Sequence, residues 1–182
     1  MKQDRRIRKT RAILKQSLIS MMKEKSIKHI TVKEICEKAD INRGTFYLHY
    51  TDVYDMFEQI ENEFFNELKD VLDKYHNSGI KLKDAHLEPL FRFLLENKDF
   101  CIVMLSGYGD MSFTKQLLQY LYDRIVAVYG KSTAKMEHYY FFVIYGCLGL
   151  ISNWLNTDAT ETPEEMAKLA EDIILNGIKR YL

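Results

Sequence analysis

The sequence predicts an all-α protein of about nine helices. Only two of its 182 residues are proline and eight are glycine, so residues that break helices are scarce. Apolar residues recur every three or four positions along most of the chain, which places them on one face of a helix. No segment shows the strict alternation of apolar and polar residues that is typical of a half-buried strand.

The first helix is expected over residues 4–25, where apolar residues such as Leu18 recur at helical spacing between basic residues. The segment SIKHI then interrupts this pattern. Thr31 begins a second, short helix with the sequence VKEICEKA. Glu34 follows Thr31 by three positions, and this spacing predicts a capping box in which each side chain bonds the other residue's backbone N–H.

A tight turn at Asp40 and Ile41 leads into a third helix, which Asn42 caps and which is expected to run to about Tyr50. Phe46 and Tyr50 are four residues apart and therefore share one face of this helix. The sequence thus predicts that these two aromatic side chains anchor the segment in the core while its other flank stays exposed.

Six further helices are expected in the remainder of the chain. Asp52 caps a long helix over residues 52–76, and NSG at 77–79 ends it. Thr162-Pro163-Glu164-Glu165 combines a cap, a proline at the first helical position and a glutamate at the third. The other expected helices cover 83–97, 99–106, 112–129, 134–156 and, after the Thr162 cap, 162–181.

Charge is distributed unevenly although the chain as a whole is neutral. Residues 1–30 contain ten Lys or Arg against two acidic residues, a net charge of +8, so the remaining residues carry −8. A basic end on a neutral chain suggests contact with a polyanion. The alternative is a solvated helix, or a disordered tail, that merely contains many lysines and arginines.

Two short helices joined by a tight turn, after a longer helix, match the helix-turn-helix pattern, in which the second helix lies in the DNA major groove. Compact donors suit phosphate oxygens, an arginine at the start of the reading helix reaches a guanine edge or a phosphate, and a glycine there lets the backbone approach. An exposed Leu48 either touches a thymine methyl or packs against a neighbour. The candidate DNA-binding residues are Arg5, Arg6, Arg8, Thr31, Lys33, Asn42, Arg43, Gly44, Thr45, Tyr47, Leu48 and His49.

The segment ITVKEICEKADINRGTFYLHYTDVYDMF resembles the DNA-binding region of the TetR family of bacterial regulators. The match covers roughly residues 8–57, and within it TVKEIC…A…INRGTFYLHY matches nearly position by position. The resemblance implies an N-terminal three-helix DNA-binding domain, here 1–51, and a helical ligand-binding and dimerisation domain, here 52–182. The stretch YGCLGLISNWLNTDATETPEEMAKLA is also similar to the end of one TetR subgroup, which includes regulators of dihydroxyacetone kinase genes.

This sequence departs from the family pattern at two positions. Asp40 stands in the turn where members often have glycine, and Asp tolerates unusual backbone angles less well than Gly does. Val53 stands where many members have a lysine that meets phosphate. Residues 31–50 are themselves neutral, so most electrostatic attraction must come from the leading helix. Its basic residues include Lys2, Arg5, Arg6, Arg8, Lys9 and Arg11.

The expected helix at 134–156 is apolar over most of its circumference, so it must be buried by its own domain or by a partner. With the apolar stripe of 162–181 it predicts a four-helix interface in a two-fold dimer; the alternative is an intramolecular core. The candidate interface residues are Tyr145, Leu148, Gly149, Met166, Leu169 and Ile173. A pocket for an unknown small-molecule effector is expected only from the resemblance. Its candidate lining residues, each of which is also compatible with plain core, are Phe91, Met104, Phe113, Phe142 and Cys147.

Patterns typical of enzymes are missing from the sequence. There is no HExxH, no Cys/His metal spacing, no GxSxG and no phosphate-binding glycine loop, so no catalytic residue, metal or cofactor is predicted. The most apolar stretch, 139–155, is shorter than a membrane span and contains polar residues, so no membrane partner is expected. Isolated Cys36, Cys101 and Cys147, and a charged start without a signal sequence, favour a cytoplasmic location in a bacterial cell.

The sequence therefore predicts a dimeric transcriptional regulator that binds a palindromic operator in double-stranded DNA and responds to a small molecule. Repression is the default expectation, and activation by recruiting another protein is the alternative. From a different class, the rival interpretation is a helical adaptor that binds a protein partner and shows no specific DNA binding.

Overall fold

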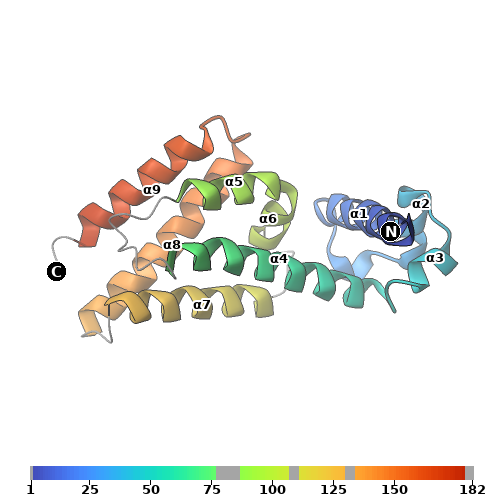
Figure 1. Cartoon of the computed structure of the whole chain (residues 1–182), viewed down its shortest axis with the longest axis horizontal. Helices are drawn as coiled ribbons and strands as arrows, with labels where there is room; N and C mark the ends of the chain where they lie inside the picture. The colour runs from blue at the N-terminus through green and yellow to red at the C-terminus, as the bar shows by residue number, and fades with distance from the viewer. Residues whose placement is uncertain (1, 77–86, 107–110, 130–133, 179–182) are drawn as a thin grey trace. The chain divides into compact units, whose positions relative to one another are not determined.

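The computed structural model describes residues 2–76, 87–106, 111–129 and 134–178, and within these ranges it is all-helical (Figure 1). The predicted all-α fold is therefore confirmed. NSG at 77–79, the start of the helix expected at 83–97 and the end of that expected at 162–181 lie outside the described ranges. The described helices are α1 (Lys2–Met22), the short 3-10 helix η1 (Ile27–His29), α2 (Val32–Ala39), α3 (Arg43–Tyr47), α4 (Val53–His76), α5 (Glu88–Glu96), α6 (Lys98–Leu105), α7 (Met111–Tyr129), α8 (Ala134–Asn156) and α9 (Pro163–Ile178).

The chain forms two compact units. Unit 1 comprises Met1–Phe64 and Val103–Gly109, and unit 2 comprises Phe65–Ile102 and Asp110–Leu182. The boundary between them falls inside α4, whose first half belongs to unit 1. The domains expected from the sequence, 1–51 and 52–182, divide the chain before this helix instead.

The core of unit 1 is built from the apolar faces of its first four helices. Helix α2 packs against both α1 and α3. The side chains of Leu14, Leu18, Ile35, Phe46, Met56 and Ile60 are almost completely buried there. Because α3 has only five residues, it is too short to be stable on its own, and its position depends on this packing.

Local capping explains where α2 and α3 begin. Thr31 Oγ1 accepts a hydrogen bond from Glu34 N at 3.3 Å, and Thr31 N donates to Glu34 Oε2 at 2.9 Å. This is the predicted capping box. Asn42 Oδ1 accepts from Thr45 N at 2.8 Å and caps α3, as its position in the sequence predicts.

Helix α3 is shorter than the sequence predicts. It ends at Tyr47 rather than near Tyr50, because the last turn tightens into bonds between residues three apart. Leu48 N donates to Thr45 O and His49 N to Phe46 O. The residues that follow are already committed to the start of α4, where Asp52 Oδ1 accepts from Asp55 N at 2.8 Å.

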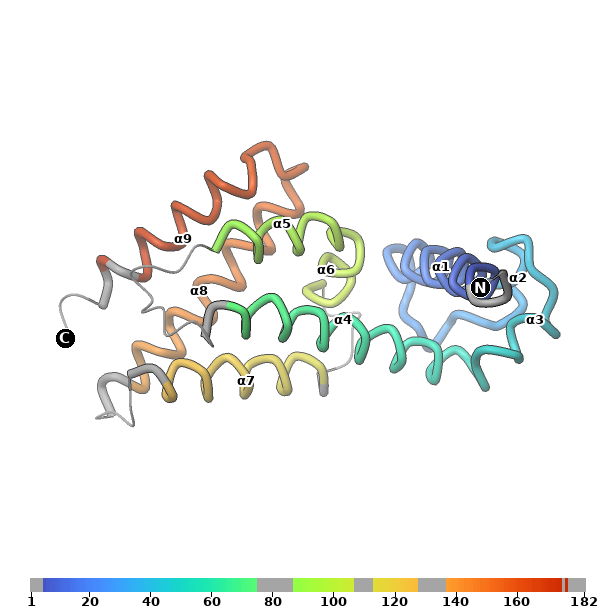
Figure 2. The backbone as a smooth tube through the Cα atoms, viewed as in Figure 1, coloured from blue at the N-terminus to red at the C-terminus, as the bar shows by residue number. Residues whose placement is uncertain are grey.

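Within unit 2, α5 lies beside α9 and α7 lies beside α8, as the backbone trace also shows (Figure 2). Trp154 of α8 is buried against Phe91 of α5, with ring centroids 5.5 Å apart. A second aromatic group joins Phe65 of α4 to Phe113 and Tyr120 of α7 at 5.9 and 5.7 Å. Thr162 and Glu165 form a second capping box, at the start of α9.

Asp40 ends α2 in the left-handed region, with φ 52° and ψ 47°. This conformation explains why glycine suits the position: a side chain raises its energy by about 1–2 kcal/mol per residue, less for Asp and Asn. The turn nevertheless satisfies its backbone, since Ile41 N donates to Cys36 O at 3.0 Å.

Replacing Asp40 tests this strain. We expect Asp40→Val to lower the free energy of unfolding by roughly 1–2 kcal/mol because a β-branched residue is poorly accommodated at positive φ. Asp40→Gly should stay within about 1 kcal/mol of wild type, since relief of strain offsets the greater freedom of the unfolded chain. Urea midpoints measure both, with exposed helical Glu58→Val as the control. A loss no larger for Asp40→Val than for the control would contradict the argument.

Candidate nucleic-acid interface

Helices α2 and α3 pack against each other across the turn at Asp40–Asn42, and α1 lies against α2. This is the arrangement of a helix-turn-helix, in which the second helix presents its exposed side to DNA. A surface hollow of about 360 Å³ lies at the turn, and Lys33, Asn42 and Arg43 contribute to its wall.

The two sides of residues 43–50, the candidate reading segment, differ in the way the sequence predicts. Phe46 is fully buried, and its ring lies 5.6 Å from that of buried Tyr50. On the opposite side Tyr47 is 57% exposed and Leu48 is 81% exposed. The exposure of Leu48 excludes the alternative that it packs against a neighbour within the described chain. Large apolar groups left in solvent beside a helix-turn-helix are suited to contact with bases and sugars.

The hydroxyl groups of two predicted contact residues are engaged in helix capping. Thr31 Oγ1 donates to Glu34 Oε2 at 2.8 Å, and Thr45 Oγ1 donates to Asn42 Oδ1 at 3.1 Å. The backbone N–H groups of both residues also donate within these caps, so a phosphate contact at either position would require the hydroxyl to rotate. Arg43, Gly44 and Asn42 are exposed, whereas Thr45 and His49 are half-buried.

Basic residues of α1 divide into two groups. Arg5, Arg6 and Arg8 are exposed, as contacts to phosphate would require. Arg11 is half-buried and hydrogen-bonds within its own unit to Tyr50, Gln59 and Glu63. Its inclusion among the DNA-attracting charges of the leading helix therefore overlooked these internal partners. The exposed Lys33 lies 3.8 Å from Glu37, a weak surface ion pair.

The first turn of α4 contains a candidate that the sequence pattern did not reveal. Val53, at the position where a phosphate-binding lysine is common, is buried in the core. The adjacent Tyr54 is exposed by more than half and lies on the same short segment that follows α3. The sequence could have pointed to Tyr54 only because this residue directly follows Val53, the position at which a lysine is expected.

The residues predicted to line an effector pocket differ in their immediate surroundings. Phe91 and Phe113 are buried in two different aromatic groups of unit 2, and Met104 is buried in α6. Phe142 and Cys147 instead line an apolar groove of about 180 Å³ between α8 and α9. That volume is below the roughly 300–1,000 Å³ typical of small-molecule sites.

The predicted dimer face is largely exposed. Tyr145, Gly149, Leu169 and Ile173 are exposed and Leu148 is half-buried, whereas Met166 is buried inside its own unit. A Cβ added at Gly146 or Gly149 would meet no atom within 4 Å outside the helix's own backbone. The α8–α9 face therefore combines exposed apolar side chains with glycines that leave room for a partner helix.

The all-helical fold and the exposed side chains of Tyr47 and Leu48 together define the class of protein: a helix-turn-helix regulator with an attached helical domain. Residues 84–176 match the family described as "Transcriptional regulator C-terminal region", TetR_C_8. The match covers half of the chain, and the chain belongs to this TetR-type family of transcriptional regulators, which are not enzymes.

Similar proteins agree with this assignment. The chain is 28% identical over 172 residues to the "Uncharacterized HTH-type transcriptional regulator YxbF" of Bacillus subtilis (strain 168), covering 90% of this chain. It spans only 44% of that relative's length. The structure is also similar to the "Dihydroxyacetone kinase operon activator DhaS", with a TM-score of 0.60, 19% identity and coverage of 94% of this chain and 97% of that one. The "fatty acid degradation regulator FadR from Bacillus halodurans" gives a TM-score of 0.63 with 14% identity, covering 93% and 96%. At these identities the two structures establish the fold alone.

Acid should weaken the start of α2. Hydrogen bonds from Lys25 at 2.6 Å and from Thr31 lower the pKa of Glu34 to about 2. Because the folded pKa lies below the unfolded value near 4.5, the carboxylate stabilises the fold above pH 4.5, and this contribution fades as the pH falls towards 2. Wild type should therefore melt above Glu34→Gln at pH 7, and the gap should narrow at pH 3. A gap that is constant with pH would contradict this assignment.

Proposed function

We propose that this protein is a homodimeric transcriptional regulator in which α3 reads a palindromic operator in double-stranded DNA. The observation that carries the proposal is the two-sided reading segment, with Phe46 and Tyr50 in the core and Tyr47 and Leu48 in solvent. Tyr47, the last residue of α3, and Leu48, its C-cap, form an exposed apolar pair at the place where a helix-turn-helix meets the DNA bases. Membership of a family of transcriptional regulators supports the same conclusion.

In this proposal, one helix supplies the electrostatic attraction to DNA phosphates and another supplies the contacts to the bases. The segment 31–50 is neutral, because its three basic residues are balanced by three acidic ones. The exposed arginines of α1 therefore supply most of the salt-dependent attraction to phosphates. Side chains of α3, together with Arg43 at its start, supply the contacts that distinguish one base pair from another.

Tyr47 provides the direct test. DNA selected from a random pool by the wild-type protein should be bound tightly, and binding should weaken with salt. Tyr47→Ala is expected to lose roughly tenfold or more in affinity, the equivalent of one good base contact, while unfolding at nearly the wild-type temperature because the side chain is exposed. Fluorescence anisotropy and thermal denaturation measure the two quantities. Thr45→Ala should also weaken binding, because it removes the hydroxyl that donates to Asn42 Oδ1, although the backbone cap from Thr45 N remains.

Exposed Lys168 of α9 offers a control, because Lys168→Met changes a surface side chain outside the helix-turn-helix. It should leave affinity, specificity and salt dependence unchanged. Failure of the wild-type protein to enrich any DNA sequence would overturn the regulator proposal and favour the adaptor.

For the dimer we propose that the α8–α9 face packs against its copy in a second chain. Phe142 is 72% exposed and lines the apolar groove with Gly146, Ile173 and Ile174. Such a face is costly to leave in water, and a two-fold partner would bury it on both chains at once. Two reading helices would then meet successive major grooves about 34–36 Å apart.

Placing a charge in the groove should separate the chains. Phe142→Asp is expected to shift the mass measured by light scattering from twice 21.6 kDa to 21.6 kDa, because a carboxylate would be desolvated in the apolar interface. Leu48→Asp introduces the same group at an equally exposed apolar residue of unit 1 and should leave the dimer intact. A wild-type protein that is monomeric at micromolar concentration would rule out the proposed interface.

We further propose that a small molecule shifts the population between dimer conformations that do and do not fit both half-sites, with repression as the default outcome. An operon activator shares the fold, so activation is the alternative outcome. No described helix is long and apolar enough to cross a membrane. We place the protein in the bacterial cytoplasm, on the nucleoid when bound to its operator.

A further inference from the structure

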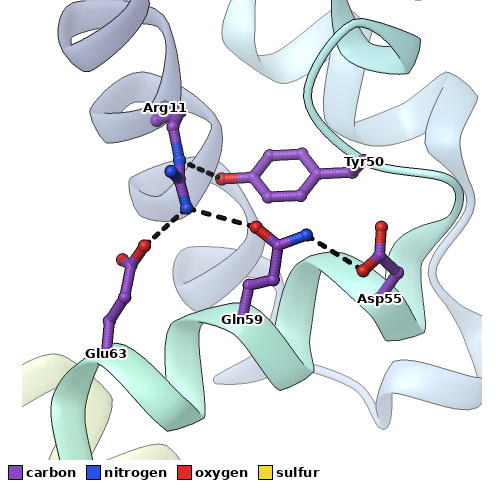
Figure 3. A network of polar contacts seen from close by, with 5 residues as sticks. All are labelled: Arg11, Tyr50, Asp55, Gln59 and Glu63. Carbon is purple, nitrogen blue, oxygen red and sulfur yellow. Dashed lines mark hydrogen bonds and ion pairs between the residues drawn. The ribbon is translucent and has the colours of Figure 1, made fainter. Parts of the chain in front are cut away.

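Arg11 lies at the centre of a polar network inside unit 1 (Figure 3). Its Nε donates to the hydroxyl oxygen of Tyr50 at 3.2 Å. Its Nη2 donates to Gln59 Oε1 at 3.3 Å and to Glu63 Oε1 at 2.5 Å. The guanidinium also lies 5.6 Å from the centre of the Tyr50 ring. One side chain of α1 thus joins the end of the reading segment to two successive turns of α4.

The network continues to the backbone between α3 and α4. Gln59 Nε2 donates to Asp55 Oδ1 at 3.0 Å, and Asp55 Oδ2 accepts from Thr51 N at 2.7 Å. Tyr50 is buried, and burial is the main reason that its pKa is raised, so its hydroxyl stays protonated at neutral pH. Residues 50 and 51, which end the reading segment, are therefore held on the side chain by Arg11 and on the backbone by Asp55.

The planar, five-donor guanidinium is what this arrangement requires. Its fixed geometry meets three acceptors at once, whereas a lysine ammonium offers a single charge centre on a flexible stem. With its charge opposed by Glu63, Arg11 is poorly placed to neutralise a phosphate as the exposed arginines of the same helix can. Arg11 therefore bonds within its own unit, whereas Arg5, six residues earlier, is exposed and can meet a phosphate.

We propose that Arg11 is a positioning residue for DNA recognition: it fixes the end of the reading segment to α1 and α4, and so sets where α3 lies relative to bound phosphates. This inference rests on the proposed operator binding. It assigns to Arg11, Tyr50 and Glu63 a role in sequence discrimination although none of them needs to touch DNA.

Substitutions at Arg11 separate positioning from phosphate binding. Operator DNA recovered by the wild-type protein and scrambled DNA of equal length would be titrated by anisotropy over a range of salt concentrations. Arg11→Met and Arg11→Lys should both lower the operator-to-scrambled affinity ratio by roughly tenfold, as when one base contact is misplaced, with the salt slope kept. Arg5→Met is the matched control: its salt slope should fall by about 0.9, with the ratio unchanged.

Three results would overturn the inference. A smaller salt slope for Arg11→Met, together with wild-type behaviour of Arg11→Lys, would show that Arg11 binds phosphate. Lower melting temperatures with unchanged affinity ratios would show a purely structural role. If Arg11→Met fails to fold, Tyr50→Phe and Glu63→Gln, which preserve shape, decide the question, and unchanged ratios in both would reject positioning.

The proposed function is tested separately in the same experiment. A wild-type protein that recovers no DNA overturns operator binding, and the inference falls with it. A wild-type protein that discriminates its operator, beside Arg11 variants that discriminate equally well, overturns the inference alone.

Discussion

Burial of Phe46 is the constraint on which the rest of the proposed DNA-reading surface depends. Helix α3 has five residues and cannot maintain its conformation by its own hydrogen bonds. Its Asn42 cap fixes one end, and buried Phe46 and Tyr50 fix its face. Only with that face anchored can large side chains such as Tyr47 and Leu48 stand in solvent at defined positions. Exposed apolar groups would otherwise collapse onto the nearest apolar surface.

Local rules account for what the sequence could predict. The capping boxes at Thr31–Glu34 and Thr162–Glu165 operate over three residues, so their spacing alone specifies where two helices start. The division of Phe46 from Tyr47 follows from helical periodicity in the same way. The left-handed backbone at Asp40 could be anticipated because glycine is common at that place in the family that the segment resembles.

Features that depend on residues far apart in the chain could not be predicted from the sequence. The sequence pattern groups Arg11 with the other cations of its helix, because its partners Tyr50 and Glu63 lie 39 and 52 residues away. The early end of α3 at Tyr47 is local instead: Leu48 N and His49 N bond to carbonyls three residues earlier, and Thr51 N then donates to Asp55 in the first turn of α4. Thr31 and Thr45 could not be assigned for another reason. A threonine hydroxyl can bond either to a helix cap or to a phosphate, and the sequence alone does not show which of these it does.

If α1 attracts the DNA phosphates and α3 contacts the bases, then DNA specificity depends on how α3 is placed against α1. In the proposed complex, arginines near the start of α1 hold the phosphate backbone while Tyr47 of α3 and the adjacent Leu48 meet the bases. Phosphate contacts carry no sequence information of their own, but they fix the register in which bases are read. A small rotation of α3 against α1 would therefore leave the attraction intact and misplace the reading contacts. The bond from Arg11 to Tyr50 spans these two parts, so a polar network remote from the exposed surface can determine specificity.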